Sequence, residues 1–274
     1  MENDKAARLA AIRAANAAKT TTAPAPPPAA SAASGEASGE LPPAMAPQAL
    51  LGLLLSAVIG AFAAVVVLPT WLPGLSNSLL GPEPSAYWYL ARSSAFVAYG
   101  LLWLSMLFGL LMTSKLSRAW PGGPTAFDLH QHTSLLGLAF ALFHALILLG
   151  DRYVAANLAQ ILVPFAYQGH APLWVGAGQL ALYALAGVGL SFYLKERIGR
   201  RLWRLIHFVS FAVFALALVH GIWSGSDSGT WWAQALYWLS GGSVLFLTIY
   251  RLLGAWRPTA GLASVLQPRR DAVD

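Results

Sequence analysis

The stretch DLHQHTSLLGLAFALFHALILLGD, residues 128–151, decides the fold of this chain. It is long and apolar enough to cross a lipid bilayer as one helix, because about 20 apolar residues span the hydrocarbon core. The same stretch carries histidines at positions 130, 132 and 144. Ionisable side chains inside a membrane are costly, and they usually mark a functional site. The stretch therefore predicts a membrane helix that bears such a site.

The composition of the whole chain is that of an integral membrane protein. Of its 274 residues, 57% are hydrophobic and 10% are charged, whereas a soluble domain has about 25% charged residues. The chain has no cysteine, which excludes disulfides, iron–sulfur clusters, thiolate nucleophiles and thiolate metal ligands. The net charge of +6 does not indicate a nucleic-acid partner, because the basic residues are distributed as in a membrane topology signal.

Six apolar runs predict an all-α fold, a polytopic bundle of six transmembrane helices in contact with membrane lipid. We place them at residues 48–68, 86–112, 128–150, 173–194, 202–223 and 231–253. Residues 153–168 are too short to span, and we expect an interfacial or re-entrant helix that stops near Pro164. The domain organisation is then a disordered Ala/Pro-rich tail at 1–47, the bundle at 48–253 and a short tail at 254–274.

The basic residues orient this bundle. Nearly all lie in the tails or in the connections on one side, and only Arg92 and Arg152 lie on the other. The positive-inside rule then places both termini in the cytoplasm, in a multi-pass protein of the cell (plasma or inner) membrane. Tryptophans at both predicted interfaces are typical of aromatic belts. The outer set is Trp71, Trp88, Trp174, Trp223, Trp231 and Trp232, and the inner set is Trp120, Trp203 and Trp256.

Four histidines lie in two spans that run in the same direction, from inside to outside. His130 and His144 are fourteen residues apart in the third span, and His207 and His220 are thirteen apart in the fifth. At 1.5 Å per residue these steps are about 21 Å and about 19.5 Å, so the imidazoles match in height as two pairs. Opposed imidazoles can hold a haem iron from both faces.

The matching of helix faces is less regular than the matching of heights. His130 and His144 share a face, because fourteen residues at 100° fall about 40° short of four turns. The thirteen residues from His207 to His220 fall about 140° short of four turns, so the two rings would not share a face on a straight helix. A kink, local overwinding or a helix tilt must bring them to the same side. A lone membrane histidine is more often an interhelical hydrogen-bond partner, so a haem-free membrane scaffold or transporter is the alternative of another class. A single zinc ion bound by both histidine pairs is excluded, because zinc ligands lie within about 2 Å of the ion and the two pairs are a membrane leaflet apart.

The spacing also carries a family resemblance. The pattern H-x13-H in the third span and H-x12-H in the fifth resembles the transmembrane domain of ferric reductases and NADPH oxidases, over residues 86–253. The stretch ARSSAFVAYG, residues 91–100, resembles the second helix of that family. The resemblance implies six helices, two stacked b-type haems and a function in transmembrane electron transfer.

Particular residues take their expected roles from this resemblance. His130 and His207 would hold the inner haem, and His144 and His220 the outer haem, as the metal ligands. Arg92 would lie near the haems and balance propionate charge or attract an anionic acceptor. We expect no catalytic side chain, because electron transfer needs none.

Two further histidines are not expected to be ligands. His132 lies two residues from His130 and so points away from that face. His170 lies in the loop sequence YQGHAP and is expected to be an exposed loop residue.

A flavin- or nicotinamide-binding domain is not visible in the sequence, which has no G-x-G-x-x-G after a strand and no βαβ pattern. The chain resembles the short bacterial members of the family, including the haem subunit of the periplasmic methionine sulfoxide reductase system. We therefore expect an oxidoreductase component with a separate electron donor, a flavoprotein or quinol, and an acceptor on the outer side. A quinol-linked haem subunit of a periplasmic reductase is the closest alternative.

Overall fold

The computed structural model describes residues 43–71 and 86–255, and these residues form helices and connections without a β-strand. The prediction of an all-α fold is confirmed for this part of the chain. The two predicted tails consist almost wholly of residues 1–42 and 256–274, which lie outside the described residues. The assignment of these tails as separate regions stays a prediction.

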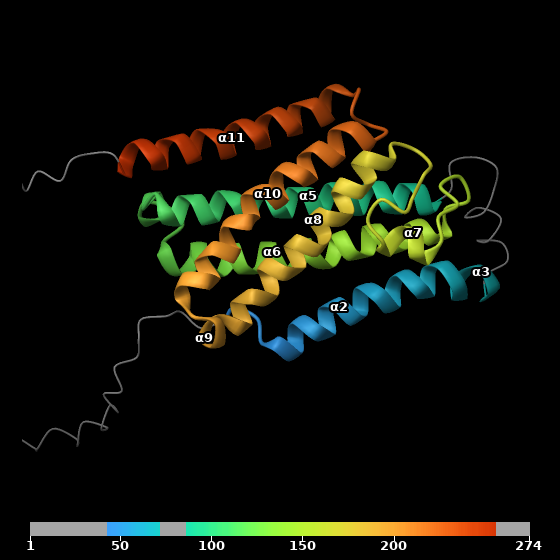
Figure 1. Ribbon diagram of the computed structural model, residues 1–274, viewed down its shortest axis with the longest axis horizontal. Helices are drawn as coiled ribbons and strands as arrows, with labels where there is room; N and C mark the ends of the chain where they lie inside the picture. Colours follow the sequence, from blue (N-terminus) through green and yellow to red (C-terminus); the bar gives the residue numbers. More distant parts are fainter. Residues whose placement is uncertain (1–42, 72–85, 256–274) are drawn as a thin grey trace, which may run out of the picture. The chain divides into compact units, whose positions relative to one another are not determined.

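Among the described residues, six helices are long and apolar enough to cross a membrane, as predicted. They are labelled as in Figure 1: α2 (Pro47–Phe62), extended by a π-helical turn at Ala63–Val67 and by α3 (Leu68–Trp71); α5 (Ala86–Thr113); α6 (Gly123–Ile147); α8 (Pro172–Ser191), followed by α9 (Lys195–Ile198); α10 (Arg200–Ser224); and α11 (Trp231–Ala255). Together they give the chain the architecture of a multi-pass membrane protein.

The third span begins five residues earlier than predicted. Its helix starts at Gly123, with Pro124 in the first turn, where the missing N–H of proline leaves no intrahelical bond unmade. The apolar run marks only the part of a helix that suits lipid, so hydropathy could not show this polar first turn. The other five spans lie within about three residues of their predicted ends, the expected error of such boundaries.

Two helix pairs form the centre of the bundle. The most extensive contacts join α5 to α6 and α8 to α10, while α2 packs on α6 and α11 packs on α5. Figure 1 shows α8 and α10 crossing α5 and α6 obliquely. Gly137 of α6 allows a close approach, because a Cβ there would lie 3.4 Å from the Cβ of Leu101 in α5.

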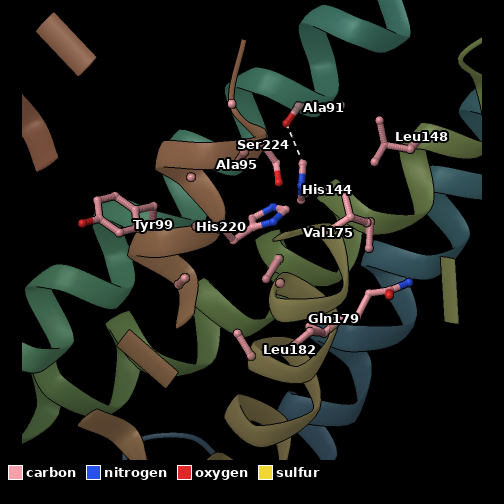
Figure 2. A pocket seen from close by; sticks show the side chains of 18 of the residues that line it. Ala91, Ala95, Tyr99, His144, Leu148, Val175, Gln179, Leu182, His220 and Ser224 are labelled. Atoms are coloured by element: carbon pink, nitrogen blue, oxygen red, sulfur yellow. Dashed lines mark hydrogen bonds between the residues drawn. The ribbon is translucent and has the colours of Figure 1, made fainter. Parts of the chain in front are cut away.

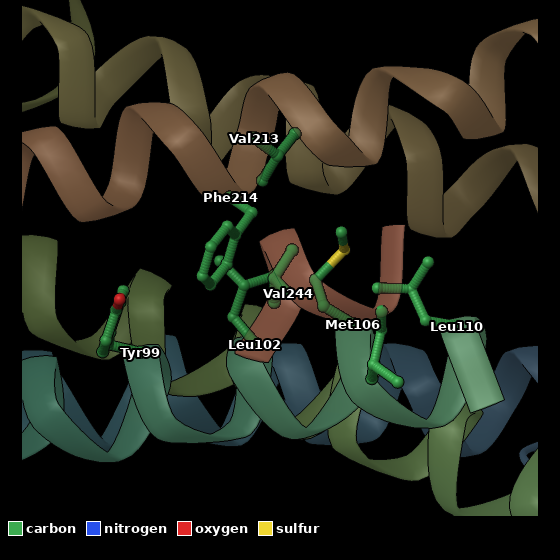
Figure 3. Close-up of a cluster of buried hydrophobic side chains, with 8 residues drawn as sticks. Tyr99, Leu102, Met106, Leu110, Val213, Phe214 and Val244 are labelled. Carbon is green, nitrogen blue, oxygen red and sulfur yellow. The ribbon is translucent and has the colours of Figure 1, made fainter. Parts of the chain in front are cut away.

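A buried apolar cluster joins α5, α10 and α11 (Figure 3). It contains Tyr99, Leu102, Met106, Leu110, Val213, Phe214, Val244 and Leu247. In lipid such a cluster is held by close packing rather than by the hydrophobic effect, because lipid tails are as apolar as the cluster itself. The Tyr99 hydroxyl lies 2.5 Å from the hydroxyl of Ser240, so this polar atom of the cluster has a partner.

The connection between α6 and α8 contains one short helix, α7 (Leu158–Leu162), which confirms that this segment is too short to span. A capping box between Asn157 and Gln160 starts it, and the extended backbone of Val163, before Pro164, ends it as predicted. The side-chain amide of Gln179 in α8 donates to the carbonyls of Gln160 and Ile161 at 2.7 and 2.8 Å. These bonds hold the connection against α8.

Candidate functional site

Two cavities lie inside the bundle, and each contains one pair of histidines. The His144 cavity, of about 530 Å³, is lined by His144 and His220. The His130 cavity, of about 360 Å³, is lined by His130 and His207. Both volumes fall in the range of about 300–1,000 Å³ that is usual for small-molecule and cofactor sites.

The structure brings the four histidines together in the pairs that their spacing predicts. The ring centroids of His130 and His207 are 5.8 Å apart, and those of His144 and His220 are 6.3 Å apart. Within residues 43–71 and 86–255, no three His, Cys, Asp or Glu side chains cluster as metal ligands. No third side chain of these types therefore clusters with either pair, although His170 and Asp227 also line the His144 cavity. The role of the four residues as ligands stays a prediction.

Three of the four rings are oriented by a hydrogen bond to a backbone carbonyl of a neighbouring helix. His130 Nδ1 lies 2.9 Å from the carbonyl oxygen of Ser105, and His144 Nδ1 lies 2.8 Å from that of Ala91 (Figure 2). His220 Nδ1 lies 2.9 Å from the carbonyl oxygen of Trp174. A carbonyl can only accept, so Nδ1 donates in each case, and Nε2 keeps its lone pair.

This tautomer is the one that suits a metal ligand. A ligating histidine commonly donates its second ring N–H to a carbonyl or carboxylate, which fixes the ring and raises the basicity of the ligating nitrogen. No Nε2 of the four rings makes a hydrogen bond to any part of the chain that the structure describes. The arrangement therefore leaves at least three lone pairs, on His130, His144 and His220, available in the cavities.

Small residues leave room for these rings. Gly109 lies four residues after Ser105, and Gly178 lies four residues after Trp174, so each glycine sits next to the accepting carbonyl along its helix. A Cβ at Gly178 would lie 2.6 Å from His220 Nδ1. A Cβ at Gly109 would lie 3.3 Å from His130 Cε1. The glycines thus allow the histidines of α10 and α6 to reach into the neighbouring helices.

His207 is held differently from the other three rings. It has no carbonyl partner among the described residues, and instead its ring stacks on Trp203, one turn earlier in α10, with centroids 5.3 Å apart and planes 26° apart. The α-helical hydrogen bonding of α10 continues without interruption over Arg200–Ser224. This argues against local overwinding, and the oblique course of α10 in Figure 1 favours helix tilt as the way in which His207 and His220 both face α6.

The two cavities adjoin each other through a shared apolar layer. Leu102 of α5, Leu185 of α8 and Val213 of α10 line both of them. The layer is made of packed side chains, and Val213 is only 1% exposed. Anything bound in one cavity is therefore separated from the other by the thickness of these side chains.

Arg92, the predicted charge near the haems, lines the His144 cavity but is already paired. Its Nε donates to Asp227 Oδ2 at 2.7 Å, and its Nη2 donates to Asp227 Oδ1. Asp227 lies in the connection between α10 and α11 and lines the same cavity. The pair is bidentate, so Arg92 has a fixed position. Its positive charge is largely balanced within the protein.

His132 and His170 lie apart from the pairs. His132 is exposed, lines neither cavity, and donates from Nδ1 to the carbonyl of Asp128 at 2.9 Å, in keeping with the prediction that it points away. His170 is exposed, as predicted for a loop residue, yet it also lines the His144 cavity together with Tyr167. Neither ring belongs to a histidine pair.

Several residues of the site were not found from the sequence. The carbonyl groups that orient the rings carry no side-chain signal of their own, although Gly109 and Gly178 could have indicated close approach to a membrane helix. Asp227 could have been noticed, because acidic residues are rare in the predicted outer connections and Arg92 needs a partner there. Trp203, which the sequence predicts at the inner interface, also stacks on His207.

Over residues 43–71 and 86–255 the chain is a helical protein with six helices of membrane-spanning length and two interior histidine pairs. Residues 86–227 match the family described as a domain of unknown function, DUF8596, and this match covers just over half of the 274 residues. The chain therefore belongs to that family. The matched segment contains Arg92, all four paired histidines and Asp227. No curated protein and no solved structure matches the chain.

Proposed function

We propose that this protein is a membrane electron-transfer protein that holds two b-type haems. His130 and His207 would be the axial ligands of one haem, and His144 and His220 those of the other. The observation that carries the proposal is the orientation of the rings, because the Nδ1 atoms of His130, His144 and His220 donate to carbonyls and leave Nε2 free to bind iron.

The dimensions of the two sites fit this cofactor. A metal–imidazole bond is about 2 Å long, so two rings on opposite sides of one metal have centroids about 6 Å apart. The observed separations of 5.8 and 6.3 Å agree with that value. The cavities supply space beside each pair, and their linings are mostly apolar, as a porphyrin requires. Haem iron with two imidazole ligands takes up and releases single electrons.

The residues of the chain orient the ligands and separate the two cavities. Leu102, Leu185 and Val213 keep the space between the two cavities apolar. Arg92 and Asp227 form a fixed ion pair at the edge of the His144 cavity. The spacing of the histidines supports the same reading, because it resembles the ferric reductase and NADPH oxidase transmembrane domain.

We further propose that both termini are cytoplasmic and that electrons pass from the His130 pair to the His144 pair, towards the outer side of the cell membrane. The asymmetry of Lys and Arg supports this orientation. The donor would be a separate flavoprotein or membrane quinol, and the acceptor would lie on the outer side. A reporter fused to the C-terminus that is active only in the periplasm would contradict the orientation.

The test of the haem proposal is a set of histidine variants of the full chain. His130→Ala and His207→Ala should each lose one haem, and His144→Ala and His220→Ala should each lose the other. The double variant His130→Ala/His207→Ala should be scarcely worse than either single variant, because the loss of one ligand already removes the shared cofactor. Haem stoichiometry and reduced-minus-oxidised spectra measure this, with His132→Ala as the matched control that keeps both haems.

A haem-free scaffold or transporter predicts a different result. The purified wild-type chain would then show no Soret band, and each substitution would lower the free energy of unfolding by roughly 0.6 kcal/mol, the average value of an interhelical hydrogen bond in a membrane. A spectrum in which His130 groups with His220 rather than with His207 would contradict the pairing, even if haem were present.

A further inference from the structure

Two side chains that line the His130 cavity carry buried hydrogen-bond donors without a partner among the described residues. These donors are Gln131 Nε2 and Trp203 Nε1. Gln131 is only 8% exposed. The backbone orients its side-chain amide, because the N–H of Ala44 donates to Gln131 Oε1 at 3.1 Å. The amide oxygen therefore has a partner, and the NH₂ group has none among the described residues. A buried donor without an acceptor is destabilising, because it has lost its hydrogen bonds to water and gained none in return.

The charges around the same cavity have one sign. Arg204 of α10 and Arg251 of α11 line it, and no Asp or Glu is among the described residues of the lining. The His144 cavity is different, since Arg92 is paired there with Asp227. A cation beside an apolar cavity is costly unless an anion balances it. The lining therefore lacks a negatively charged group.

We propose that Gln131, Trp203, Arg204 and Arg251 form a carboxylate-binding edge of the His130 cavity, which takes the two propionates of the haem bound there. This inference rests on the proposed function and adds the orientation of the cofactor. The N–H groups of Gln131 and Trp203 donate to carboxylate oxygens, and the two arginines balance their charge. Ala44 acts as a positioning residue, because its N–H decides which end of the Gln131 amide faces the cavity.

An anionic lipid headgroup offers the same chemistry from another source. Arginines near helix ends commonly extend towards lipid phosphates, which accounts for Arg204, an exposed residue. It does not account for Gln131 Nε2 or Trp203 Nε1, which are buried. The buried donors therefore favour a ligand that enters the cavity itself.

The test compares iron protoporphyrin IX with its dimethyl ester, which lacks both carboxylates. The full chain carries His144→Ala, so that only the His130 cavity can bind, and the dissociation constant of each compound is measured from the Soret band. The ratio of the two constants is then compared between variants. This comparison cancels the different partition of the diacid and the ester into detergent, which is the same for every variant. We expect the diacid to bind at least about tenfold more tightly than the ester, the effect of one hydrogen bond to a charged group.

Substitutions should reduce this preference without weakening the ester. Trp203→Phe keeps an aromatic ring next to His207 and removes the N–H together with part of the indole, and Gln131→Met keeps about the same side-chain volume. Arg204→Gln removes one charge, and Arg201→Gln is the matched control on the same helix, since Arg201 does not line the cavity. Each of the first three should lower the preference by about threefold to about tenfold, and the control should leave it unchanged.

The outcomes separate the inference from the function on which it rests. If the chain binds neither compound, the proposed function fails and the inference fails with it. Equal binding of diacid and ester, or variants that weaken both compounds alike, overturns the inference alone. Titrations in phosphatidylcholine vesicles with and without phosphatidylglycerol test the other source. If the variants lose bound phosphatidylglycerol and keep the preference for the diacid, the four residues bind lipid and the inference is wrong.

Discussion

Gly178→Ala tests the way in which the His144 cavity is built. Gly178 lies on α8, and a Cβ at this position would meet three ring atoms of His220 at 2.6, 2.7 and 2.8 Å. Ordinary non-bonded contacts between heavy atoms are about 3.5–4.0 Å, so the ring must move by roughly 0.8 Å or more. The bond of 2.9 Å from His220 Nδ1 to the carbonyl of Trp174 cannot survive that displacement with good geometry.

The size of the effect follows from two terms. Overpacking a close-packed site costs about 1–3 kcal/mol, and a lost hydrogen bond costs about 1 kcal/mol. Together they weaken haem binding at this site by about 2–4 kcal/mol, a factor of roughly 30 to roughly 700. Alanine is a better helix former than glycine by about 1 kcal/mol, so the haem-free protein itself should be little destabilised.

Gly109→Ala is the matched control in the other cavity. Its Cβ would lie 3.3 Å from His130 Cε1, so the ring needs to yield by only a few tenths of an ångström. The two variants therefore differ in severity, although both add one methyl group next to a paired histidine. The assay is the haem content of each purified variant, with spectra that identify which haem is lost and thermal unfolding of the haem-free protein.

The expected result is loss of the haem held by His144 and His220 in Gly178→Ala, and retention of both haems in Gly109→Ala. If Gly178→Ala keeps both haems with unchanged spectra, the position of the His220 ring is not needed for binding and the reasoning is refuted. If both variants lose haem equally, the contact distances do not decide the outcome.

Three further predictions concern the surroundings of the site. Asp227→Asn leaves the charge of Arg92 unbalanced and should raise the midpoint potential of the haem in the His144 cavity, on the order of tens of mV in a redox titration. Tyr87→Phe removes a buried bond of 2.6 Å to the carbonyl of Ala64 and should lower the free energy of unfolding by about 1 kcal/mol, measured by thermal unfolding. Gln179→Leu removes the hydrogen bonds that hold the α6–α8 connection against α8. Limited proteolysis should therefore cleave this connection faster than in the wild type, while the helices themselves stay protected.

The number of spanning helices could be predicted because hydropathy depends only on the local sequence. The heights at which the histidines pair could be predicted, because a helix rises by a constant step per residue. Their angular match could not, since it depends on how α10 crosses α6, which is decided by packing against α5 and α8. The start of α6 at Gly123 was missed for a related reason, because a polar first turn has no hydropathy signal.

The hydrogen-bond partners of the rings were beyond the sequence for a different reason. Any helical residue supplies a carbonyl, so nothing in the residue types marks Ser105 or Trp174 as acceptors. The pairing of Arg92 with Asp227 joins positions 135 apart in the chain, and Arg152 on the same predicted side was the other basic residue that could have paired with Asp227. Such contacts are decided by tertiary structure, and the sequence could indicate only that a buried charge needs a partner.

The two cavities differ in charge, and the difference bears on the direction of electron transfer. Arg92 and Asp227 nearly cancel at the His144 cavity, whereas Arg204 and Arg251 leave the His130 cavity with two positive charges. Positive surroundings favour the reduced state of a bound redox group. Electrons would then be retained at the His130 pair, and passage towards the His144 pair would be uphill. A haem in the His144 cavity would carry two carboxylates as well, so carboxylates at the edge formed by Gln131 and Trp203 leave this difference between the two sites in place. We therefore expect the haem held by His130 and His207 to have the higher midpoint potential, which a redox titration that resolves the two haems measures.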